Sequence, residues 1–211
     1  MKFILKGVCH QDVSEQVECQ NLEQLSFDFR PKSFNFIQGY KVLDILKKTQ
    51  KSYQYSLMFD NEKDFVISEF LKKTPDDLSS SIFLEFFNES SLEFMEKFGK
   101  KYFWHYNDKV KIRDISQCQN IDRIIFTHEH LELLHQQGEL FGFFQLFSDY
   151  FHKVMIEVQL NWNTELISSL VDMFQIPLFS FEISHEVEKS YQNPDYELIS
   201  NILNNLSDQL N

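Results

Sequence analysis

Several histidines and acidic residues lie close to the ends of predicted strands in this sequence. They are Asp60, His105, His128, His130, His185 and Glu186. Imidazole and carboxylate groups bind divalent metal ions, so this set predicts one possible function, that of a metal-dependent hydrolase or lyase. The spacing is not diagnostic, since an HExxH pattern is absent, and the alternative is a set of solvated or hydrogen-bonded loop residues. We therefore expect no metal and no cofactor.

Charge and cysteine usage exclude several classes of partner. The chain has 211 residues and a formal net charge of -12, which argues against binding to nucleic acid or to an anionic membrane surface. It contains no apolar run of about 18 residues, so no membrane span is predicted. Three cysteines (Cys9, Cys19 and Cys118) without CxxC spacing indicate reduced thiols, and we expect a cytoplasmic protein.

Short apolar runs alternate with longer stretches of helical periodicity along the whole chain. The predicted strands are 2–8, 25–29, 53–59, 82–87, 102–106, 122–127, 154–160 and 178–183. The predicted helices are 11–20, 39–50, 62–73, 91–97, 141–152, 164–174 and 194–206, and the segment 110–120 has a poor pattern where a further helix is needed. Residues 127–130 are interpreted as a polar loop or the start of a helix.

Eight strand–helix units of about 25 residues each predict a closed barrel. No linker or low-complexity segment interrupts them, so we expect an α/β fold with one (β/α)8 TIM-barrel domain over residues 1–211. The aromatic runs 83–87 and 141–147 are interpreted as core, although an exposed segment at 140–144 could instead support a homodimer.

Three segments, in the same order along the chain, resemble the phosphoribosylanthranilate isomerase family of tryptophan biosynthesis. The first is LSFDFRPKSFNFIQ, with Phe27, Phe29, Pro31, Ser33 and Ile37 at matching positions of the second strand and its loop. The second is IEVQLNWNTE, which is similar to the family's seventh-strand segment through Leu160 and Asn161. The third is FEISHEVEKSYQNPD, which is similar to the eighth-strand signature through Glu182, Ile183, Ser184, Val187, Glu188 and Asp195. The resemblance implies a (β/α)8 barrel.

The resemblance also implies an Amadori rearrangement, in which a cysteine after strand one is the base and an aspartate after strand six is the acid. This chain has Leu5 or Lys6 at the cysteine position and Thr127 at the aspartate position. The groups that could replace the missing pair are Lys6 or Cys9 as the base and His128 or Glu129 as the acid.

The family's phosphate site depends on glycines after strands seven and eight. Residues 143–211 contain no glycine, and Val158-Gln159 and Glu186 occupy the expected glycine positions. A Cβ atom obstructs close approach of a ligand to the backbone, and a carboxylate repels a phosphate dianion. Asn35 replaces a substrate-contacting arginine, which removes a cationic clamp.

The missing acid–base pair, glycines and arginine favour a barrel of this family that has lost isomerase activity and binds another small molecule or a partner. Ser33, Asn35, Ser184 and His185 are the residues expected to bind that ligand at the barrel mouth. The alternatives are an active isomerase with relocated acid and base groups, the metal-dependent enzyme, and a plain interaction module. The protein is expected to be a monomer or a homodimer.

Overall fold

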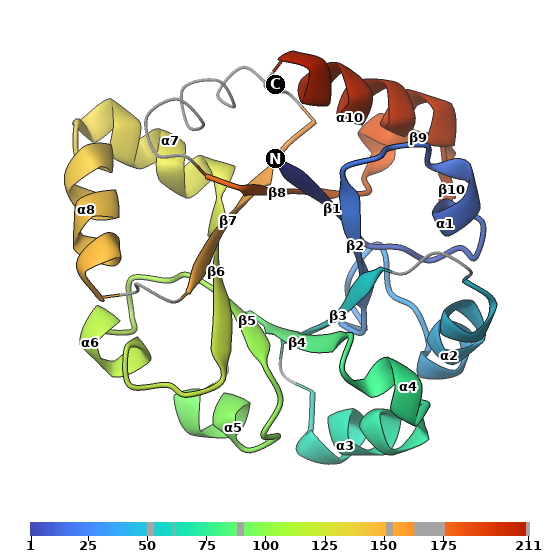
Figure 1. The fold of residues 1–211 in the computed structure, drawn as a ribbon, viewed down its shortest axis with the longest axis horizontal. Helices are drawn as coiled ribbons and strands as arrows, with labels where there is room; N and C mark the ends of the chain where they lie inside the picture. The colour runs from blue at the N-terminus through green and yellow to red at the C-terminus, as the bar shows by residue number, and fades with distance from the viewer. Residues whose placement is uncertain (50–52, 61, 88–90, 151–153, 163–175, 210–211) are drawn as a thin grey trace.

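The computed structural model describes residues 1–49, 53–60, 62–87, 91–150, 154–162 and 176–209. Its strands form one closed parallel barrel in the order β1 to β8 (Figure 1). They are β1 (Lys2–Lys6), β2 (Leu22–Asp28), β3 (Gln54–Phe59), β4 (Ile82–Phe86), β5 (Tyr102–His105), β6 (Ile121–Thr127), β7 (Met155–Leu160) and β8 (Leu178–Glu182). The predicted (β/α)8 barrel is confirmed.

Helices surround the ring of strands (Figure 1). They are α1 (Val13–Gln16), α2 (Gly39–Lys48), α3 (Asp64–Lys73), α4 (Asp76–Ser79), α5 (Leu92–Glu96), α6 (Ile112–Ile115), α7 (His128–Gln137), α8 (Leu140–Tyr150) and α10 (Tyr196–Gln209). A short 3-10 helix, His185–Val187, and a two-stranded ribbon of β9 (Glu188–Ser190) and β10 (Asn193–Pro194) connect β8 to α10. The predicted helix 164–174 lies outside the described residues.

Of the two interpretations of residues 127–130, the start of a helix is confirmed. The helix begins at His128, because the Thr127 hydroxyl accepts a hydrogen bond from the His130 N–H and Leu131 and Leu134 bury one face. The last helix begins at Tyr196 instead of Pro194, because Pro194 belongs to β10 and the Asp195 carboxylate accepts from the Leu198 N–H.

Alternating strand residues face either the helices or the barrel interior. Outward-facing aromatic rings build the main apolar core; Phe126 of β6, for example, packs against Phe143 and Phe147 of α8 at centroid distances of 5.3 and 5.0 Å. The alternate residues meet inside the barrel, where Phe83, Phe103 and Ile125 form a small separate apolar cluster. Most of the other fully buried residues at these alternate positions are polar, among them Lys6, Ser56, Glu85 and Glu157.

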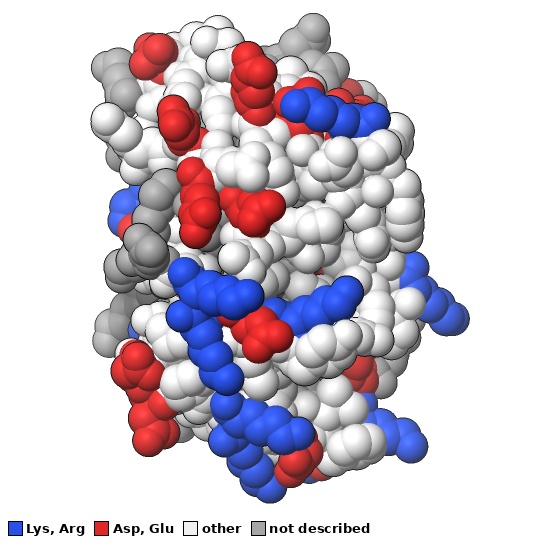
Figure 2. Space-filling view, turned by 90° about the vertical axis from the view of Figure 1, so that its right-hand side faces the viewer, with Lys and Arg blue, Asp and Glu red and all other residues white. Residues whose placement is uncertain are grey.

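Charge is unevenly spread over the outer surface. Figure 2 shows a face on which acidic groups gather toward one end and Lys and Arg groups toward the other. Among the described residues, no helix is both long enough and apolar enough to cross a membrane.

Candidate functional site

Lys6 occupies the interior of the barrel at the end of β1. Its side chain has no exposure to solvent, and its Nζ lies 2.6 Å from Oε1 of Glu85 and 2.8 Å from Oε1 of Glu157. Burial alone would lower the pKa of Lys6, but the charges of Glu157 and Glu85 outweigh burial and raise it. Lys6 is therefore protonated at neutral pH and has no lone pair with which to accept a proton.

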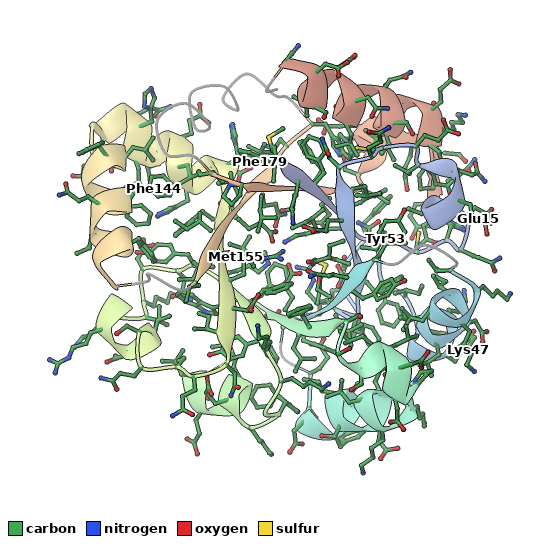
Figure 3. The ribbon with its side chains drawn as sticks, in the orientation of Figure 1. Glu15, Lys47, Tyr53, Phe144, Met155 and Phe179 are labelled. Atoms are coloured by element: carbon green, nitrogen blue, oxygen red, sulfur yellow. The ribbon has the colours of Figure 1, made fainter. Side chains whose placement is uncertain are left out.

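A network of buried polar groups surrounds this ion pair, and nitrogen and oxygen atoms are visible among the side chains that fill the barrel (Figure 3). The further hydrogen bonds run from Arg123 Nη1 to Glu157 Oε2 (2.7 Å) and Gln24 Oε1 (3.1 Å), from His105 Nε2 to Glu85 Oε1 (2.7 Å), and from Ser56 Oγ to Glu85 Oε2 (2.8 Å). Burial opposes ionisation of Glu85 and Glu157, but the Lys6 charge outweighs it and lowers the pKa of both carboxyls, with the His105 hydrogen bond adding to the effect at Glu85 and the Arg123 charge adding to it at Glu157.

A stack of side chains covers the network at the barrel mouth. Arg30 binds Asp28 through two hydrogen bonds of 2.9 and 2.6 Å, and its guanidinium carbon lies 3.9 Å from the ring centroid of Phe87. The Phe87 ring in turn stacks on the His105 imidazole at 3.8 Å. Burial and the Lys6 charge lower the pKa of His105, so this imidazole is neutral. The centre of the mouth is thus filled by protein groups.

The other candidate acid and base groups lie apart from Lys6. Burial raises the pKa of the Cys9 thiol to about 11, so it is not a thiolate at neutral pH. Burial would also raise the pKa of Glu129, but its own backbone N–H and the Asn161 side chain hydrogen-bond its carboxylate and lower the pKa overall. Glu129 therefore stays ionised and is a poor proton donor. His128 is the first residue of α7, with Nδ1 3.9 Å from Oε2 of Glu132.

A cleft of about 490 Å³ opens beside this stack, at the carboxyl ends of β7 and β8. It brings together three of the four predicted ligand residues, Asn35, Ser184 and His185. Its other lining residues are Phe34, Gln159, Leu160, Asn161, Trp162, Glu182, Ile183 and Glu186. Ser33 does not line the cleft; its Oγ accepts a hydrogen bond from the Asn35 N–H and so helps to hold Asn35 in place.

Glu182 lies at the border between the cleft and the stack. Its carboxylate is 3.5 Å from Arg30 Nη2 and accepts a 3.3 Å hydrogen bond from Gln159 Nε2. Burial raises its pKa, an effect that the nearby Arg30 charge only partly offsets. This carboxyl group combines access to the cleft with a perturbed pKa, as groups at ligand sites often do.

The histidines that suggested a metal centre are dispersed. His105 belongs to the buried network, whereas His130 packs among the rings of Tyr106, Phe126 and Phe143. Within the described part of the chain, no three His, Cys, Asp or Glu side chains are grouped as metal ligands would be. The geometry therefore gives no support to the metal-dependent hydrolase or lyase.

Sequence analysis missed the charged barrel interior. Glu85 and Glu157 are the only charged residues of β4 and β7, and Arg123 follows Asp122 in β6; all three stand at positions where the alternation demands a side chain pointing into the barrel. A charge at such a position is the signal that could have revealed them, because an isolated buried charge must have a partner.

Comparison with known proteins gives likeness of fold only. No family model matches the sequence, and no curated protein matches it. Among solved structures, a phosphoribosyl anthranilate isomerase from Thermus thermophilus aligns with a TM-score of 0.69 and 9% identity, over 99% of this chain and 100% of the other. The isomerase from Thermotoga maritima aligns with a TM-score of 0.69 and 13% identity, over 100% of both chains. The enzyme from Pyrococcus furiosus aligns with a TM-score of 0.67 and 12% identity, over 99% of both.

Proposed function

We propose that this chain is a divergent phosphoribosylanthranilate isomerase-like barrel that has lost isomerase activity and binds a small polar molecule in the cleft at β7 and β8. The observation that carries the proposal is the state of Lys6, which stands with Leu5 at the expected position of the family's catalytic base; Leu5 belongs to the main apolar core and cannot accept a proton. Lys6 is fully buried between two carboxylates and remains protonated. A base must reach the substrate proton and be able to accept it, and Lys6 meets neither condition.

The acid position supports the same conclusion. Thr127 ends β6, and its hydroxyl accepts the hydrogen bond that begins α7. A hydroxyl group has far too high a pKa to protonate a ribose ring oxygen efficiently near neutral pH. Neighbouring Glu129 is held ionised, as described above, and Cys9 is held as a neutral thiol.

Isomerase turnover tests the proposal directly. Purified protein would be assayed with freshly made phosphoribosylanthranilate beside the Thermotoga maritima isomerase, with circular dichroism to verify folding. We expect no turnover above the rate without enzyme. Clear turnover would overturn the proposal and favour an active isomerase with relocated groups, in which case Lys6→Met, Cys9→Ala, His128→Ala and Glu129→Gln would identify them.

We also propose a cellular compartment and an oligomeric state for the protein. Cys9, Cys19 and Cys118 are free thiols, which suits a reducing compartment such as the cytoplasm. A monomer or homodimer is proposed, and sedimentation across a range of protein concentrations distinguishes the two.

A further inference from the structure

Four side chains around the cleft each direct an N–H donor to a protein acceptor. These hydrogen bonds run from Asn35 Nδ2 to the Ile183 carbonyl (2.7 Å), from Gln159 Nε2 to Glu182 Oε2 (3.3 Å), from Asn161 Nδ2 to Glu129 Oε1 (3.0 Å), and from Trp162 Nε1 to the Glu182 carbonyl (2.8 Å). These bonds use the indole N–H and one N–H of each amide, which reduces the number of donors left for an anionic or carbonyl oxygen.

The same arrangement leaves acceptors without donors. Asn35 is 1% exposed, and its Oδ1 has no hydrogen-bond partner among the described residues. The orientation of this amide is fixed, because the Ile183 carbonyl can only accept and so must face the NH₂ group. Gln159 Oε1 is likewise buried and unpartnered within the described structure. A buried acceptor without a donor is unfavourable, and an N–H donor that reached either oxygen from the cleft would satisfy it.

The charge of the cleft also favours a ligand that donates hydrogen bonds over an anion. Two carboxyl groups, Glu182 and Glu186, and the imidazole of His185 line it, and its described lining includes neither Lys nor Arg. The nearby guanidinium of Arg30 binds Asp28 and stacks on Phe87, and makes only a longer contact of 3.5 Å with Glu182. Trp162 and Phe34 add aromatic surface, which is favourable for cations.

We propose that this cleft binds a small organic cation that donates N–H hydrogen bonds, such as one with a primary ammonium or guanidinium group, and does not bind an anion. The volume of about 490 Å³ suits a metabolite-sized molecule. This inference rests on the proposed function for its choice of the cleft as the ligand site, and it names the class of ligand.

The test uses the full chain labelled with ¹⁵N and titrated with agmatine, putrescine, ribose or inorganic phosphate at constant ionic strength. The sequence has two tryptophans, and Trp104 is fully buried in the barrel wall. The indole N–H signal of Trp162 therefore reports on the cleft and that of Trp104 is an internal control. We expect agmatine or putrescine to shift the Trp162 signal with saturation, and phosphate to leave it unchanged.

Matched variants locate the binding site. Glu186→Gln and Glu182→Gln each remove one lining carboxyl group and should weaken cation binding about tenfold. Glu139→Gln removes the same charge from an exposed position elsewhere and should change it less than twofold. Equal effects of all three variants, or no saturable shift with either cation, would overturn the inference.

Two other results distinguish a failure of this inference from a failure of the proposed function. Saturable binding of phosphate or ribose at Trp162, without cation binding, would refute the cation class while leaving the cleft as a ligand site. Isomerase turnover would refute the proposed function itself.

Discussion

Lys6 shows how far the chemical properties of one residue depend on the groups that surround it. Nothing in its immediate sequence distinguishes a catalytic lysine from a structural one. The structure places its ammonium group between Glu85 and Glu157, in a network without access to solvent. A buried ion pair contributes little net stability compared with apolar packing, but removing one partner leaves an uncompensated charge. We therefore interpret this network as a fixed part of the barrel interior.

Acid should destabilise the protein through this network. Glu85 stays ionised in the folded state far below its ordinary pKa of 4.5, whereas the unfolded chain takes up a proton near that value. Stability from this group is therefore complete above about pH 5 and is lost as the pH falls. We expect Glu85 alone to account for a loss of about 2 kcal/mol in the free energy of unfolding between pH 5 and pH 3.

Urea denaturation of wild-type protein and Glu85→Gln at both pH values checks this expectation. The variant keeps a hydrogen-bonding side chain but cannot titrate. Between pH 5 and pH 3 its free energy of unfolding should therefore fall by about 2 kcal/mol less than that of the wild-type protein. An identical fall in the two proteins would show that the pKa of Glu85 does not differ between the folded and unfolded states.

Gly7 lies where the loop after β1 contacts the loop after β2. It follows β1 with φ of 75°, and a Cβ atom there would lie 2.3 Å from Asn35 Nδ2 and 2.6 Å from Asn35 Cγ. Asn35 in turn binds the Ile183 carbonyl after β8. The loops that follow β1, β2 and β8 are thus packed together at one point, and this contact forms one wall of the cleft.

Gly7→Ala should be clearly more destabilising than a matched substitution without the close contact. Gly138 ends α7 with φ of 73°, but a Cβ atom there meets no described atom within 4 Å. Gly138→Ala should cost about 1 kcal/mol from the left-handed conformation alone. Gly7→Ala should cost about 1–3 kcal/mol more because the Asn35 side chain must move. Equal losses in urea denaturation would mean that Asn35 adapts freely.

At the scale of the molecule, closure of the barrel leaves no strand of the ring with an unpaired edge. β1 is hydrogen-bonded to both β2 and β8, although β8 lies near the other end of the chain. The β9–β10 ribbon lies outside the ring and has two strands only. Hydrogen bonds in a central strand open only when a large part of the fold opens.

Amide hydrogen exchange should reflect this difference. We expect amides of β1 and β8 to exchange as slowly as those of β3 and β4, and amides of residues 188–194 to exchange at least about 100-fold faster. Mass spectrometry of peptides after exchange would measure both, with the unfolded protein as the reference. Rapid exchange confined to β1 and β8 would indicate that the ring opens at that seam.

The sequence by itself determined the alternation of strands and helices and the barrel, because these are local properties of residue type and spacing. It also placed Asn35, Ser184 and His185 near one mouth, since the ends of parallel strands meet there. Only the tertiary structure decided that Lys6 faces two carboxylates, that Arg30 and Phe87 fill the mouth, and that the cleft presents acceptors instead of donors. Those properties depend on contacts across the barrel between residues that are distant in the sequence, because such contacts determine hydrogen-bond partners and pKa values.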